Sequence, residues 1–192
     1  MFLASFALMV VEIVAGRVTA PYLGVSLYTW TSVIGAVLLG VTIGNYVGGH
    51  VADRRLSPTL LGSSFGLAGV SVFCVNALAL WSGSRLASFS WPLPVLTSLF
   101  TIIVFFPAAF FLSMISPQIV KYELQQLDHT GSIIGTLGAW SALGSILGTF
   151  ATGFFFIASV GIHRILLVVA GALIALGAII AADRRHWTHP AV

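Results

Sequence analysis

Two charged residues interrupt an otherwise apolar stretch near the N-terminus of the chain. Glu12 and Arg17 both lie within residues 2–20, where the other side chains are apolar or small. A charged group near the centre of a bilayer costs at least about 2.5 kcal/mol, so it faces the protein interior and finds a partner there. Glu12 is therefore a candidate for binding a cation or a proton, and a purely structural buried carboxylate is the alternative.

The position of Arg17 favours a different role. The separation between it and Glu12 corresponds to about 140° around a helix, so a salt bridge between the two side chains is awkward. Arg17 also lies near the end of the apolar stretch, where a long side chain can extend to the membrane surface. We expect a structural role for Arg17, and a place in an interior polar site is the alternative.

Glu12 and Arg17 must lie on apolar helices, because the chain has too few charged residues to form the surface of a soluble domain. The 192 residues are 58% hydrophobic and 7% charged, with a mean hydropathy of +1.07. Soluble domains carry roughly 25% charged residues, and a helix needs about 20 apolar residues to cross a membrane. The sequence therefore predicts an all-α polytopic membrane protein with about six transmembrane helices. The expected spans are residues 2–20, 28–51, 58–81, 94–116, 131–160 and 162–182.

The segments between these spans are short. Pro21 is expected to end the first helix, and Pro117 to end the fourth and open a polar segment that runs through His129. Residues 183–192 are expected to form a polar tail. We expect neither a cleaved signal peptide nor a soluble catalytic domain.

Stripes of small residues mark two of the predicted helices as packing elements. Their members recur every four residues, which places them on one helix face, where two backbones can approach closely. The stripes are Gly40, Gly44 and Gly48 in the second helix, and Gly144, Gly148 and Thr152 in the fifth. We expect tight packing within the fold, and contact with a second chain or sliding during transport is the alternative.

The two stripes keep a constant separation along the chain, and Gly49 and Gly153 form a further pair at that separation. Each stripe also follows a span that is expected to end at a proline. This pattern indicates two three-helix repeats, which are inverted because the first and fourth helices start on opposite sides of the membrane. Inverted repeats recur in secondary transporters. The simpler reading is that glycine is common in membrane helices.

The basic residues between spans predict the orientation of the chain. Five of them fall on one side of the membrane and two on the other. The first group is Arg54, Arg55, Lys121, Arg184 and Arg185, and the second is Arg85 and Arg164. Because Lys and Arg accumulate on the cytoplasmic side, we expect both termini in the cytoplasm and the chain in the inner (plasma) membrane of the cell.

Several kinds of site are not expected. The pI near 9.5 rests on few residues and no basic patch contains interleaved aromatics, so nucleic acid is not an expected partner. Cys74 is the sole cysteine and is expected to be a small core residue. His186 and His189 lack a third ligand beside them, so no metal is expected. No nucleotide-binding or catalytic motif is present, so we expect no cofactor, no catalytic residue and no enzymatic activity.

The end of the second predicted helix carries a compact charged motif. Gly49, Asp53 and Arg54 stand at the cytoplasmic end of that span and resemble the signature loop between helices 2 and 3 of major facilitator transporters. We expect Asp53 to cap the next helix or to pair with a basic group from another loop.

The run from Glu12 to Pro21, followed by Tyr28-Thr-Trp30-Thr, resembles the first two helices of the membrane-bound spermidine synthase-like proteins. That family joins a major-facilitator-type membrane half to a Rossmann-fold aminopropyltransferase-like domain. The resemblance touches most of the chain and implies a six-helix half of the facilitator fold, without the soluble domain. Where the family often carries Tyr and Asn in the fifth helix, this chain has Gly138 and Ser141, which leaves Ser141 as a candidate for an interior polar site.

The resemblance also implies a need for a second protein, because one facilitator half supplies one wall of a transport path. We expect a homodimer or a partner membrane protein within the lipid bilayer. The first hypothesis is a transporter-like half acting on a small metabolite, a cationic one if Glu12 is the interior anion. The alternatives are a structural or accessory subunit of a larger membrane complex, and a membrane anchor for a separate spermidine synthase-like protein.

Overall fold

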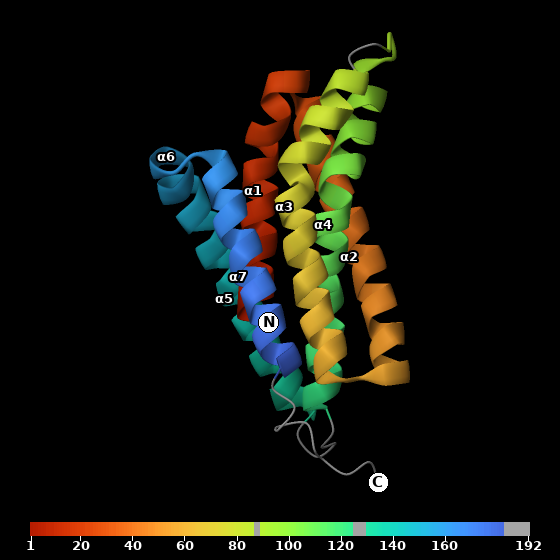
Figure 1. Ribbon diagram of the computed structural model, residues 1–192, viewed down its shortest axis with the longest axis vertical. Coiled ribbons are helices and arrows are strands. Elements are labelled where there is room, and N and C mark those ends of the chain that lie inside the picture. Colours follow the sequence, from red (N-terminus) through yellow and green to blue (C-terminus); the bar gives the residue numbers. More distant parts are fainter. Residues whose placement is uncertain (87–88, 125–129, 183–192) are drawn as a thin grey trace.

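The computed structural model describes residues 1–86, 89–124 and 130–182 of the chain. Long helices run side by side along the long axis of the molecule (Figure 1). They are α1 (Phe2–Leu23), α2 (Leu27–Arg55), α3 (Pro58–Leu86), α4 (Leu93–Glu123), α5 (Thr130–Phe150) with its continuations η2 (Ala151–Phe156) and α6 (Ile157–Ser159), and α7 (Ile162–Ala182). The expected tail, residues 183–192, lies outside the described part.

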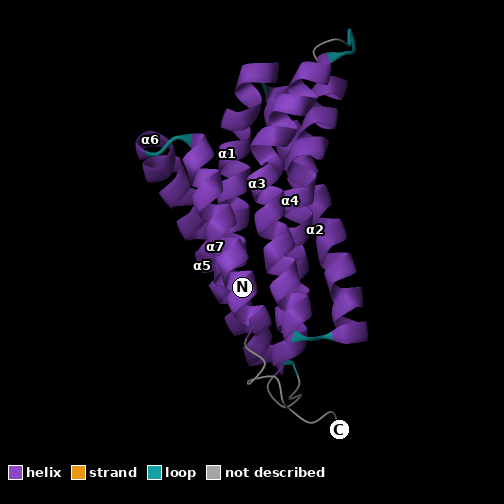
Figure 2. Cartoon of the chain, in the orientation of Figure 1, coloured by secondary structure: helices purple, strands orange, loops and turns teal. Residues whose placement is uncertain are grey.

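Within the described residues, six helical spans are long and apolar enough to cross a membrane, as the sequence predicts. The described residues contain no strand, and short loops join α1 to α2, α2 to α3 and α6 to α7 (Figure 2). The chain is therefore an all-α, multi-pass membrane protein.

The prediction that Pro21 ends the first helix is wrong. α1 continues to Leu23 with Pro21 inside its last turn. Pro21 lacks the N–H that would bond the carbonyl of Arg17, so one hydrogen bond is lost near the helix end, where the regular hydrogen bonding stops in any case. The helix ends instead at Gly24, whose φ of 71° lies in the left-handed region that glycine adopts readily.

The predicted end of the fourth helix at Ser116 is also wrong. α4 runs through both Pro107 and Pro117 to Glu123, so the expected polar segment from 117 begins as helix. Residues 125–129 of that segment lie outside the described residues. Membrane helices tolerate proline because neighbouring helices and hydroxyl side chains compensate the lost hydrogen bond, whereas a broken backbone in lipid leaves several groups unpaired.

The fifth span is helical throughout but changes its winding. After Phe150 the chain forms a π-helical segment, Ala151–Phe156, before the short α6. Thr152 lies in this segment, is fully buried, and its hydroxyl has no hydrogen-bond partner in the described part of the chain. The sequence placed Thr152 on a regular helical stripe, and local periodicity gives no signal for a π turn.

The helices associate in specific pairs. α2 packs along α4, α5 packs along α1, and α3 packs against both α7 and α4. α1 also contacts α4, so these two helices connect the pairs at the centre of the bundle. One continuous apolar core fills the space between them, with fully buried aromatic side chains at Phe100 and Phe105.

Glycines set how closely the paired helices approach. Gly40, Gly44 and Gly48 face the backbone of α4, and a methyl group at Gly48 would lie 2.6 Å from the Met114 carbonyl oxygen. Gly144 and Gly148 face the start of α1 in the same way, against Phe2 and Phe6. These glycine members of the two stripes therefore pack within the chain. Nothing lies within 4 Å of a side chain added at Gly153. The additional pair at the same separation, Gly49 and Gly153, therefore does not share the close helix contact of the two stripes.

A third close contact was not among the sequence expectations. Gly62 of α3 and Gly177 of α7 face each other, and a methyl group at either would lie 2.6 Å from the other's carbonyl oxygen. The residues flanking this pair, Phe65 and Ala181, complete the contact. No regular stripe surrounds Gly177, so spacing alone does not distinguish it from an ordinary membrane glycine.

The α2–α4 contact predicts opposite outcomes for two glycine-to-alanine changes on α2. Gly44→Ala places a methyl group against the Phe110 carbonyl and should lower stability by about 1–3 kcal/mol, because one helix must move. Gly35→Ala is the matched control, since nothing lies within 4 Å of it and alanine favours helix by about 1 kcal/mol. Thermal unfolding in detergent measures both, and equal stability of the two variants would contradict the close approach.

Candidate functional site

A pocket of about 190 Å³ lies where α1, α2, α4 and α5 meet. Four apolar side chains form part of its wall, and the remaining lining side chains are small and polar. The polar members are Ser5, Asn45, Ser113, Ser116, Ser141 and Ser145. Every polar group in this wall is uncharged, so the site offers hydrogen bonds rather than ion pairing. We call it the serine pocket.

Hydroxyl groups in the serine pocket are only partly paired with one another. The Oγ atoms of Ser5 and Ser141 lie 2.6 Å apart and share a hydrogen bond between α1 and α5. Ser113 is only 5% exposed, and its hydroxyl has no hydrogen-bond partner among the described residues. A buried unpaired hydroxyl is unfavourable, so the wall of this pocket retains an unused hydrogen-bonding group.

A wider depression of about 440 Å³ adjoins the serine pocket. Asn45 and Ser116 line both hollows. Asp53 and Lys121 lie farther along the depression, where Lys121 Nζ is 2.9 Å from Asp53 Oδ1. The depression therefore joins the charged end of the bundle to the serine pocket.

Glu12 lies on the same face of α1 as the serine pocket but does not line it. Ser5, Leu8 and Glu12 are spaced three and four residues apart, which aligns them along one side of the helix. Ser5 and Leu8 line the pocket, and Glu12 follows one turn farther along. Its side chain is half-buried and makes no hydrogen bond or ion pair within the described residues.

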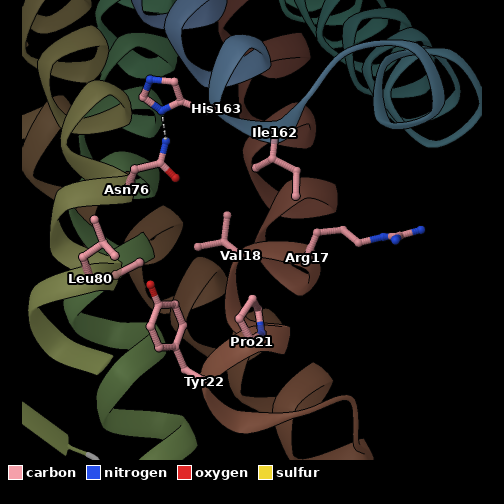
Figure 3. Close-up of a pocket in the computed structure, with 9 residues that line it drawn as sticks. Arg17, Val18, Pro21, Tyr22, Asn76, Leu80, Ile162 and His163 are labelled. Atoms are coloured by element: carbon pink, nitrogen blue, oxygen red, sulfur yellow. Dashed lines mark hydrogen bonds between the residues drawn. The ribbon is translucent and has the colours of Figure 1, made fainter. Parts of the chain in front are cut away.

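The structure does not bring Arg17 together with Glu12 or Ser141. Arg17 is exposed at the opposite end of α1, on the rim of a separate hollow of about 380 Å³. Its guanidinium extends away from the other lining residues, while Asn76 and His163 are joined by a 2.8 Å hydrogen bond (Figure 3). Arg17 thus lies in a different hollow from Ser141, and its place in an interior polar site stays a prediction.

The motif expected as a loop is helical. Gly49, Asp53 and Arg54 all lie inside α2, which ends only at Arg55. The next helix is capped by Ser57, whose Oγ accepts the backbone N–H of Leu60 at 3.1 Å, so Asp53 is not the cap. Asp53 is free to pair with Lys121 on α4 instead.

Sequence reasoning missed most of the polar groups that the fold gathers. Ser5, Asn45, Ser113 and Ser145 come from four different helices, and no spacing links them in advance. Gln118 was missed as well: it is fully buried in α4 and its Nε2 donates to Ser64 Oγ of α3 at 2.9 Å. The sequence could have indicated these groups only through their residue type, because an amide or hydroxyl inside a membrane span needs a hydrogen-bond partner.

No family model, curated protein or solved structure matches the chain.

The Asp53–Lys121 pair predicts a small, salt-sensitive contribution to stability. Both side chains are more than half exposed, and exposed pairs are worth about 0–1 kcal/mol. Lys121→Ala should therefore lower stability by no more than about 1 kcal/mol. The double exchange Asp53→Lys with Lys121→Asp should recover part of that loss. Unfolding in detergent at low and high salt measures the effect, and a loss that high salt does not reduce would contradict an ionic origin.

Proposed function

We propose that this multi-pass membrane protein is a transporter-like half of the major facilitator type, which works with a second six-helix half on a small metabolite. The observation that carries the proposal is Glu12, a half-buried carboxylate within a span that has no partner in the described part of the chain. Ionisable groups inside spans mark substrate and ion paths. In this role Glu12 favours a cation.

Asn45 supports the same function. It lies within α2, is exposed, and makes no hydrogen bond in the described part of the chain. Polar groups in spans avoid lipid and face a bundle interior or a water-filled path. Glu12 and Asn45 thus lie on surfaces that favour water, substrate or protein over lipid chains.

Helix packing supports the two inverted repeats that a facilitator half requires. If α1, α2 and α3 correspond to α4, α5 and α7, the pair α2–α4 corresponds to α5–α1. Both pairs pack closely, each through glycines of the second member of its repeat, such as Gly44 and Gly144. The same kind of contact in both pairs supports a common origin better than chance enrichment in glycine.

Exposed surfaces of α2 and α5 support a second half beside this one. α5 buries only Gly144 and Gly148, and the turns of α2 next to Asn45 expose Leu38 and Thr42. These surfaces adjoin the serine pocket, which a second half would close from the open side. We take the second half to be another copy of this chain, because a homodimer needs no other protein.

The distribution of charge supports a cytoplasmic location of both termini. Arg54, Arg55 and Lys121 lie at the end of the bundle where α2 and α4 terminate, and Arg85 and Arg164 lie at the other end. An excess of Lys and Arg identifies the cytoplasmic side. A plasma membrane is the setting that this arrangement fits.

If Glu12 binds the transported cation, replacing its carboxylate should reduce cation uptake. In vesicles reconstituted with the chain, labelled methylammonium, ethanolamine or guanidinium should enter faster than in empty vesicles. Glu12→Gln should reduce that uptake about tenfold or more, because the charge that offsets cation desolvation is removed. Glu123→Gln is the matched control, since Glu123 is exposed at the end of α4. Uptake that Glu12→Gln leaves unchanged would remove this residue from the path.

A second half predicts a defined assembly. Gentle purification followed by native mass determination should give twice the chain mass of 20.3 kDa. With the sole cysteine removed by Cys74→Ser, Leu38→Cys on α2 should form a disulfide between copies under mild oxidation. Val168→Cys is the control, because Val168 is 69% exposed on the outer face of α7.

Other assemblies would redirect the proposal. A stoichiometric foreign membrane protein would favour an accessory subunit, and a soluble synthase-like protein would favour a membrane anchor. Equal crosslinking at Leu38 and Val168 would contradict a specific interface on α2.

A further inference from the structure

We propose that the serine pocket is a binding site for a small, uncharged organic solute that donates and accepts hydrogen bonds, of the polyol or amide class. This inference does not rest on transport or on pairing of two halves, because the site is formed within one chain. It assigns a ligand class to a hollow that Glu12 does not line.

The lining chemistry selects hydrogen-bonding solutes. A serine hydroxyl both donates and accepts, and the carboxamide of Asn45 does so through separate atoms. Polyols and amides carry the same mixture of donors and acceptors. The polar groups come from four helices and surround one volume, so a ligand can be held from several sides. They are Ser5, Asn45, Ser113, Ser116, Ser141 and Ser145.

Ser113 is the observation that distinguishes a ligand site from a packing gap. Its side chain is 5% exposed, and its hydroxyl is unpaired among the described residues, although serine in a helix commonly bonds a carbonyl of the preceding turn. Ser71 and Ser82 of α3 do form such bonds, at 2.7 Å and 2.6 Å. The pocket beside Ser113 is where a partner for its hydroxyl can be supplied.

The size and access of the pocket suit a small molecule. Its volume of about 190 Å³ is well above the share of one water molecule in the liquid, about 30 Å³. Asn45 and Ser116 connect it to the wider depression at the charged end of the bundle. A solute can therefore enter from that end without crossing the apolar core.

The absence of charge in the wall argues against ionic ligands. Burying an ion without a counter-charge is costly. The nearest ion pair along the polar route, Asp53 with Lys121, is internally neutral and lies in the adjoining depression. Glu12 lies one turn beyond Leu8 and is not among the residues that line the pocket, so the wall itself carries no counter-charge.

Saturation-transfer NMR on the purified chain in glycerol-free detergent tests the site with four probes of similar size. Glycerol and acetamide represent the proposed class, and methylammonium and acetate represent cations and anions. At least one neutral probe should receive magnetisation from the protein. Neither charged probe should compete with it. Ser113→Ala should weaken binding about threefold to tenfold, the value of one neutral hydrogen bond.

Two further variants show whether the transferred signal originates in the serine pocket. Ser145→Leu fills the space and should abolish the signal, whereas Ser63→Ala should leave it unchanged, because Ser63 is exposed on α3 and bonds the Leu60 carbonyl. Ser113→Ala should fold at least as well as the parent, since it removes an unpaired hydroxyl. No transfer to either neutral probe, equal competition by a charged probe, or a signal that Ser113→Ala and Ser145→Leu both leave unchanged would overturn the proposal. These outcomes do not depend on vesicle uptake or on dimerisation.

Discussion

Backbone-to-backbone contact at glycines is the interaction on which this bundle depends. In lipid, burying apolar side chains between helices gains little, since lipid chains are equally apolar, and association relies on close packing. Gly44 against Phe110 joins α2 to α4, and Gly144 against Phe2 joins α5 to α1. These contacts leave α1 and α4 at the centre. The positions of the polar groups in the serine pocket follow from that arrangement.

The serine pocket is a consequence of the same packing. Small side chains are needed where four helices converge, and serine is small enough to allow the approach while still carrying a polar group. The Ser5–Ser141 hydrogen bond lies on the α1–α5 pair, near the glycine contacts of that pair. The proposed site for hydrogen-bonding ligands lies at the junction of the two pairs, where the small serine side chains leave a hollow with a partly polar wall.

Several expectations from the sequence differ from the structure for physical reasons. Hydropathy located all six spans, because the length of an apolar run reflects the thickness of the membrane. Local rules failed at Pro21 and Pro117, which lie inside helices, since lipid penalises broken helices more than it penalises a missing donor. The placement of Asp53 in a loop failed similarly, because the polar end of α2 stays helical past the apolar segment.

The sequence by itself determined the class of the protein, the number of spans, the small-residue faces and the exceptional carboxylate at Glu12. Those properties depend on composition and on spacing within one helix, and both can be read directly from the amino-acid sequence. Tertiary structure alone decided which helices pair, and that Asn45 and the serines meet in one pocket. Residues distant in the chain come together only through the packing of whole helices, and no local periodicity records the partner that each helix face selects.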